Sequence, residues 1–194
     1  MNHTKKIQIE DTIYEANTDF RIAIECNRIA TDETIGDFER ALGVICTMFG
    51  PTALDNPNHY EKLLNWAKNY LSCGVDASAA SEEQYMDYVE DKKYIASSFK
   101  YDYNYNPYDM EYLSWEDFYN DLSNLSNSEL GNCCVLNRVI NLRKMDISKI
   151  KDAKTRHEVM EAKKSVALKK HKKVKHITKE QEESMNKLNE ILGL

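Results

Sequence analysis

Apolar residues recur along most of this chain at steps of three and four, the spacing that places them on one face of a helix. The stretch MEYLSWEDFYNDLSNL at residues 110–125 shows this most clearly, with Trp115, Phe118 and Leu122 on one stripe. Ser114 stands where its hydroxyl can cap the free amides of a first helical turn. We therefore interpret the stretch as an amphipathic helix packed into a core, in preference to an aromatic box for a ligand.

Other segments repeat the same spacing, and turn-forming residues are scarce. The chain has only six glycines and three prolines in 194 residues, which predicts long helices and short connections instead of a many-stranded sandwich or barrel. The residues expected in the structural core are Phe20, Phe38, Leu42, Trp115, Phe118 and Leu122.

The beginning of the chain has a different period. Ile7, Ile9 and Ile13 alternate with polar residues on either side of Glu10 and Asp11, as in a small β-hairpin. The expected fold class is therefore mainly α: a multi-helix body with a small N-terminal β-hairpin and a basic helical C-terminal extension.

Two changes in composition suggest the domain organisation. Residues 75–91 are small and acidic without a clear apolar face, so we predict a mobile acidic connection there. Beyond Asp152, apolar residues thin out among lysines. We expect a helical body over residues 1–152 and a basic helical tail over residues 153–194.

Five tyrosines crowd residues 101–112, and two interpretations apply to them. Alternating rings such as Tyr103 and Tyr105 could form an adhesive surface for a protein or for nucleic-acid bases. Such rings more often pack a loop on the body while their hydroxyls reach water. We favour packing and keep Tyr103 and Tyr105 as candidate partner-binding residues.

Charge is divided unevenly along the chain. Residues 1–137 hold 10 Lys+Arg and 24 Asp+Glu, whereas residues 138–194 hold 16 and 8. An acidic body with a basic tail indicates contact between them, self-association, or an acidic partner for the tail.

The candidate partner-binding lysines are Lys163, Lys164, Lys169, Lys170, Lys172, Lys173 and Lys175. They could neutralise phosphates, but residues 163–176 contain no arginine or aromatic residue to read or stack a base. We therefore expect protein contact, and we regard nucleic acid as an unfavoured partner.

Sequence motifs for catalysis are missing. The glycines form no phosphate-binding loop, the histidines no H-E-x-x-H, and the five cysteines no C-x-x-C. We expect no enzymatic activity, no cofactor and no metal.

The start of the chain lacks the apolar region of a secretion signal, and no apolar run is long enough to span a membrane. A cytoplasmic protein is expected.

Three segments, in order, carry a resemblance to a known family. They are IQIEDTIYEANTDFRIAI at residues 7–24, KKYIASSFKYDYNYNPYDMEYLSWEDF at residues 92–118 and NLRKMDISKIKD at residues 141–152. Together they resemble the bacteriophage gene-product-fifteen family, the last one through its R-x-M-D-L-S-K-I-K-D segment. The chain departs from the family's Leu-His-Trp-Trp block, since Ser114 replaces the histidine and Glu116 the second tryptophan.

The resemblance implies a protein of phages or prophages with long non-contractile tails. Genes of this family usually lie between those of the major tail protein and the tape measure protein. That position implies a tail assembly chaperone for the tape measure protein, with the major tail protein as a second partner. It would act in the host cytoplasm and be absent from the mature virion. The competing hypotheses are a small nucleic-acid-binding or regulatory phage protein that uses the lysine tail, and a structural virion subunit.

Overall fold

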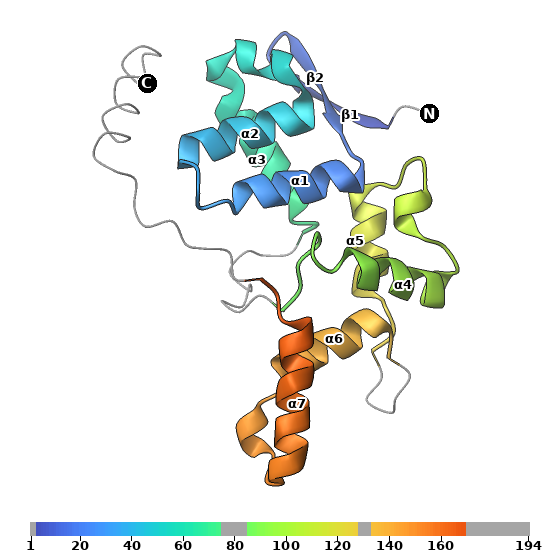
Figure 1. Ribbon diagram of the computed structural model, residues 1–194. Coiled ribbons are helices and arrows are strands. Elements are labelled where there is room, and N and C mark those ends of the chain that lie inside the picture. The colour runs from blue at the N-terminus through green and yellow to red at the C-terminus, as the bar shows by residue number, and fades with distance from the viewer. Residues whose placement is uncertain (1–2, 75–84, 128–132, 170–194) are drawn as a thin grey trace, which may run out of the picture.

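The computed structural model describes residues 3–74, 85–127 and 133–169 (Figure 1). Within them, seven α-helices accompany one two-stranded antiparallel sheet, which confirms the mainly α fold with an N-terminal hairpin. The strands are β1 (Thr4–Ile9) and β2 (Thr12–Asn17). The helices are α1 (Phe20–Ala30), α2 (Asp37–Phe49), α3 (Tyr60–Leu71), α4 (Lys92–Tyr103), α5 (Trp115–Ser123), α6 (Val135–Lys144) and α7 (Ala153–Val166). Short 3₁₀ turns are η1 (Pro51–Asp55), η2 (Pro57–His59), η4 (Pro107–Asp109) and η5 (Ile147–Lys149).

The hairpin turns at Glu10 and Asp11, as its alternating pattern predicts. Gln8 pairs with Ile13 across the strands, and Glu10 adopts a left-handed conformation with φ of 54° that closes the tight turn. The Glu10 carboxylate lies 3.0 Å from the Lys62 ammonium of α3. The tip of the hairpin is therefore tied to the beginning of α3.

Part of the core is a stack of aromatic rings contributed by α1, α4 and α5. Phe118 stacks on Phe20 of α1 at 4.4 Å between ring centroids and on Phe99 of α4 at 5.4 Å. Trp115, one turn before Phe118, is also buried. These four side chains join α1, α4 and α5, and Figure 1 shows α4 and α5 close to the beginning of α1.

The first turn of α5 is set by local chemistry and by a contact with the start of α1. Ser114 Oγ accepts a hydrogen bond from the Asp117 amide at 3.0 Å. The Phe20 amide donates to the Leu113 carbonyl, and the Trp115 amide donates to the Thr18 carbonyl, both at 2.9 Å. The two helices therefore begin side by side and direct Phe20 and Trp115 into the same core.

Ser114→Ala is expected to lower the free energy of unfolding by about 1 kcal/mol, because it removes the side-chain cap from α5. Ser97→Ala, at an exposed position within α4, is the matched control and should leave stability nearly unchanged. Denaturant unfolding followed by circular dichroism measures both. Equal midpoints for the two variants would contradict a capping role for Ser114.

Two expectations about the core require correction. Phe38 and Leu42 on α2 are only partly buried and lie outside the core cluster, because α2 turns Val44, Ile45 and Met48 inward instead. Leu122 is partly buried and packs against the cluster.

The prediction of a mobile connection fails for residues 85–91, which pack on the body. Tyr88 lies edge-on to Trp115 at 5.6 Å, and Asp91 is buried. The sequence shows no apolar face there because scattered side chains make the contacts instead of a regular stripe, among them Met86, Tyr88 and the buried Asp91. The rest of the predicted connection, residues 75–84, lies outside the described residues.

Candidate functional site

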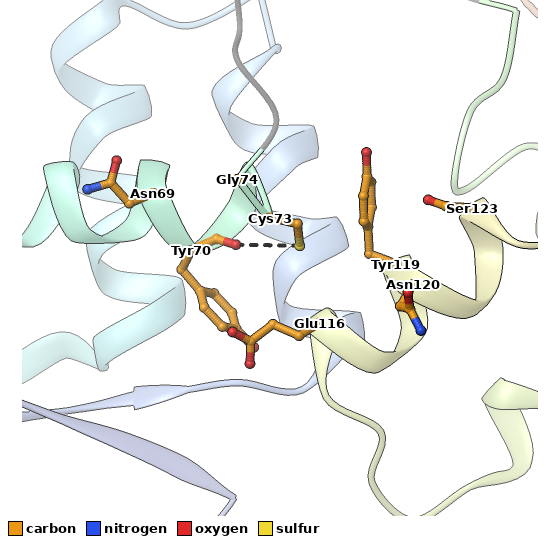
Figure 2. A pocket seen from close by; sticks show the side chains of 8 residues that line it. All are labelled: Asn69, Tyr70, Cys73, Gly74, Glu116, Tyr119, Asn120 and Ser123. Atoms are coloured by element: carbon orange, nitrogen blue, oxygen red, sulfur yellow. Dashed lines mark hydrogen bonds between the residues drawn. The ribbon is translucent and has the colours of Figure 1, made fainter.

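A hollow between the end of α3 and the outer face of α5 is the first candidate site (Figure 2). Its volume is about 380 Å³. The residues that line it are Asn69, Tyr70, Cys73, Gly74, Glu116, Tyr119, Asn120 and Ser123. Asn69 and Tyr70 lie in the last turn of α3, Cys73 and Gly74 follow shortly after it, and α5 presents the others at helical spacing.

Tyr70 and Cys73 are two of the groups in this hollow that could ionise to a nucleophile. The Tyr70 hydroxyl donates to the Thr18 carbonyl at 3.1 Å, and burial raises its pKa above the usual range. The Cys73 thiol points toward the Tyr70 carbonyl at 3.7 Å, the dashed line in Figure 2, and burial raises its pKa too. Burial therefore favours the protonated form of both groups.

The carboxylate of the hollow, Glu116, is already paired. Lys5 of β1 donates to both of its oxygens, at 2.7 and 2.8 Å, and lies 5.0 Å from the centre of the Tyr70 ring. Over the residues that the structure describes, no three His, Cys, Asp or Glu side chains are grouped to hold a metal ion. The hollow offers hydrogen-bonding groups but no base beside a nucleophile.

A second hollow lies beside the start of α4, where Tyr108 and Lys92 are among the lining residues. The Lys92 ammonium is 4.6 Å from the centre of the Tyr108 ring. The Tyr108 hydroxyl is buried and has no hydrogen-bond partner among the described residues, and burial raises its pKa to about 12. This hollow therefore presents the face of a ring, the ammonium groups of Lys92 and Lys93, and the carboxylates of Glu90 and Asp109.

Tyr103 and Tyr105 are held by the body. The Tyr103 hydroxyl donates to the Asp121 carbonyl at 2.8 Å, and the Tyr105 hydroxyl donates to the Asp121 carboxylate at 2.5 Å. Both rings lie edge-on to Phe99 of the core, at 5.7 and 5.6 Å. These contacts support packing over an adhesive surface, while Tyr101 on the same helix remains exposed.

Of the predicted partner-binding lysines, Lys163, Lys164 and Lys169 lie within the described residues, and none of these three lines either hollow. Lys163 donates to the Met145 carbonyl at 2.5 Å, and Lys164 pairs with Glu161 within α7 at 2.7 Å. The Lys169 amide donates to the Glu90 carboxylate at 3.0 Å. Lys170, Lys172, Lys173 and Lys175 lie outside the described residues.

We call residues 145–169, which comprise η5 and α7, the arm, because they project from the helical body in Figure 1. The caps of the arm come from the NLRKMDISKIKD segment. Asp146 accepts from the Ser148 amide at the start of η5, and Asp152 accepts from the Thr155 amide at the start of α7. The exposed cations of the arm include Lys149, Lys151, Lys154 and Arg156. The arm is therefore a 3₁₀ turn followed by a helix, each capped by a nearby aspartate, with a basic exterior.

Sequence reasoning missed a buried ion pair. Arg143 of α6 and Asp91, which precedes α4, lie 2.6 Å apart. The arginine belongs to the NLRKMDISKIKD segment, so that match contained a signal for one partner. The sequence gives no such signal for Asp91, because this residue ends an acidic stretch of the kind that is usually exposed to solvent.

Comparison with known proteins identifies a family. Residues 2–168 match the family model described as bacteriophage Gp15 protein. A search of curated proteins and of solved structures finds no significant match. In the described part of the chain, no helix is both long and apolar enough to cross a membrane. Because the match covers the hairpin, the helical body and nearly the whole arm, the chain belongs to the bacteriophage Gp15 family and is a phage protein.

Proposed function

We propose that this phage protein acts in tail assembly, as a chaperone that binds the tape measure protein in the host cytoplasm. The major tail protein is the second partner, and the chaperone leaves before the virion is complete. No enzymatic activity, metal or cofactor is part of the proposal. The observation that carries it is the arm, in which no residue of α7 is buried.

The arm has the mixed surface that an amphipathic helical partner requires. Val159 and Met160 are only partly buried on α7, and Met145 at the base of the arm is exposed. Lys154 and Arg156 lie exposed on the same helix. Apolar side chains beside cations suit a partner helix with an apolar stripe and acidic flanks.

The chemistry of the expected partner supports the same conclusion. A tape measure protein is long and amphipathic, so before the tail tube surrounds it, it exposes apolar stripes that promote aggregation. The 14-unit excess of Asp+Glu over Lys+Arg in residues 1–137 would keep such a complex soluble. Family membership adds that the chain comes from a phage.

Co-expression with the tape measure protein of the same phage tests the proposal. The full chain should raise the soluble fraction of that protein and co-purify with it. Lys154→Glu with Arg156→Glu should weaken both effects, whereas Lys68→Glu with Lys100→Glu, on exposed positions of the body, should not. A tape measure protein that stays insoluble with the full chain would contradict the proposal.

The lysine tail is tested separately, with a chain that ends at Lys169. A cut at Lys163 would also remove Val166, whose carbonyl binds Arg143, so the later end is the cleaner choice. We expect weaker binding to the partner and an unchanged fold.

The nucleic-acid hypothesis is tested by measuring how tightly the full chain binds duplex DNA at ~0.15 M salt. Tight binding that is lost when Lys169, Lys170, Lys172 and Lys173 become Glu would favour that hypothesis instead. Dimers of the full chain alone, lost with the arm variants, would indicate self-association.

A further inference from the structure

Arg143, near the end of α6, joins three segments that lie far apart in the sequence. Its guanidinium holds both oxygens of the Asp91 carboxylate, with Nη1–Oδ2 at 2.6 Å and Nη2–Oδ1 at 2.7 Å. Nη1 also donates to the Tyr85 carbonyl at 2.9 Å, and Nε donates to the Val166 carbonyl at 2.6 Å. The side chains of Arg143 and Asp91 are 8% and 1% exposed. One buried side chain therefore connects α6, the segment before α4 and the last residue of α7.

The attachment of α7 depends strongly on this contact, because the helix contributes little apolar burial. None of its residues is buried, and it packs against α6 and η5. The last carbonyls of a helix lack partners within the helix and carry the negative end of its dipole. A guanidinium at the Val166 carbonyl satisfies one of these groups and also complements the dipole.

The other described bonds that hold the end of the arm are exposed. They run from the Lys163 ammonium to the Met145 carbonyl and from the Lys169 amide to the Glu90 carboxylate. Water competes for exposed bonds of this kind, whereas a charge-assisted bond inside the protein is stronger. Arg143 is therefore the main fixed point for the C-terminal end of α7.

We propose that Arg143 is a latch that holds α7 against the body. When the guanidinium is replaced by a group that cannot make its three sets of hydrogen bonds, α7 detaches from the body while the aromatic core stays folded. The planar fork can serve Asp91, Tyr85 and Val166 at once, which a single ammonium cannot do. Opening the latch would uncover the faces that α6 and η5 turn toward α7, and would redirect the chain beyond Val166. This device does not depend on which partner the protein binds.

Hydrogen exchange of the full chain, read by mass spectrometry, tests the latch through Arg143→Lys. The lysine keeps a positive charge beside Asp91 but cannot also reach Val166. Amides in the last turns of α7 should exchange on the order of tenfold faster, the effect of losing about one charge-assisted hydrogen bond. Amides of α1 and α5 should keep their parental rates.

A second variant removes the charges without leaving either one buried alone. Asp91→Leu combined with Arg143→Met fills similar volume with apolar atoms, a replacement that buried ion pairs often tolerate. The same selective loss of protection in α7 is expected. Lys164→Met is the matched control, since it removes a cation of α7 whose described ion pair is with Glu161 of the same helix.

Two results would overturn the latch. Parental exchange of α7 in the double variant would mean that packing on α6 suffices to hold the helix. Faster exchange of α1 and α5 to the same degree as α7, in both variants, would mean that Arg143 supports the whole core without controlling α7. If Arg143→Lys does not fold, the double variant decides between these outcomes.

Discussion

Replacing Trp115 with alanine is expected to lower the free energy of unfolding by about 3–5 kcal/mol, the cost of truncating a large buried aromatic side chain. The indole is 1% exposed and packs against Phe118, Tyr88 and Tyr119, with ring centroids 5.6–5.9 Å away. Its Nε1 donates to the Leu71 carbonyl at 3.0 Å. The substitution therefore leaves a cavity among rings and also an unpaired carbonyl. Denaturant unfolding followed by far-UV circular dichroism measures the change.

Two further variants separate these causes. Trp115→Phe keeps an aromatic ring and loses the hydrogen bond to Leu71, so its loss of stability should lie between those of the parent and the alanine variant. Tyr101→Ala, at a ring that is 73% exposed on α4, should unfold nearly as the parent does. If Trp115→Ala also unfolds like the parent, the ring does not belong to the core, and a ligand site at α5 becomes the better interpretation.

Asp91→Ala is expected to cost about 3–5 kcal/mol, because it leaves the buried Arg143 guanidinium without a counter-charge. Arg143 cannot relieve the loss by releasing its proton, because a guanidinium stays protonated in proteins. Asp91 Oδ2 also accepts from the Asp87 amide at 3.1 Å, and that amide loses its acceptor as well. The same unfolding measurement applies.

The matched control for Asp91 is an ion pair at the surface. Lys5 and Glu116 lie 2.7 Å apart, with side chains 47% and 52% exposed. Glu116→Ala should change stability by only about 0–1 kcal/mol, because water solvates the lysine that remains. A cost for Asp91→Ala no larger than that for Glu116→Ala would show that the buried pair contributes nothing beyond a surface one.

The start of α5 shows that neighbouring residues in the sequence determine where a helix of this fold begins. Ser114 at the cap and the stripe through Trp115 and Phe118 lie within five residues, and the helix begins where they predict. The hairpin turn at Glu10 and Asp11 likewise follows from the alternating pattern on either side of it. Periodicity and capping involve bonds between near neighbours in the chain, so the sequence alone carries them.

The candidate hollow could not be predicted, because its walls come from two separate helices. Tyr70 lies at the end of α3 and Cys73 just after it, while Glu116 and Tyr119 lie on α5. Each of these residues is unremarkable within its own segment. Only the docking of α3 against α5, through the bond from Trp115 to Leu71 across 44 residues, places them together.

What the sequence by itself determined is the set of helices, the hairpin, the basic exterior of the arm and the resemblance to the phage family. The tertiary structure decided which faces are buried, turning Val44 and Ile45 inward where Phe38 and Leu42 were expected. It also decided that Asp91, in an acidic stretch, meets Arg143 across 52 residues. The physical reason is that a local pattern shows that a face is apolar or a residue charged. Which other segment covers that face or neutralises that charge depends on the packing of the whole chain.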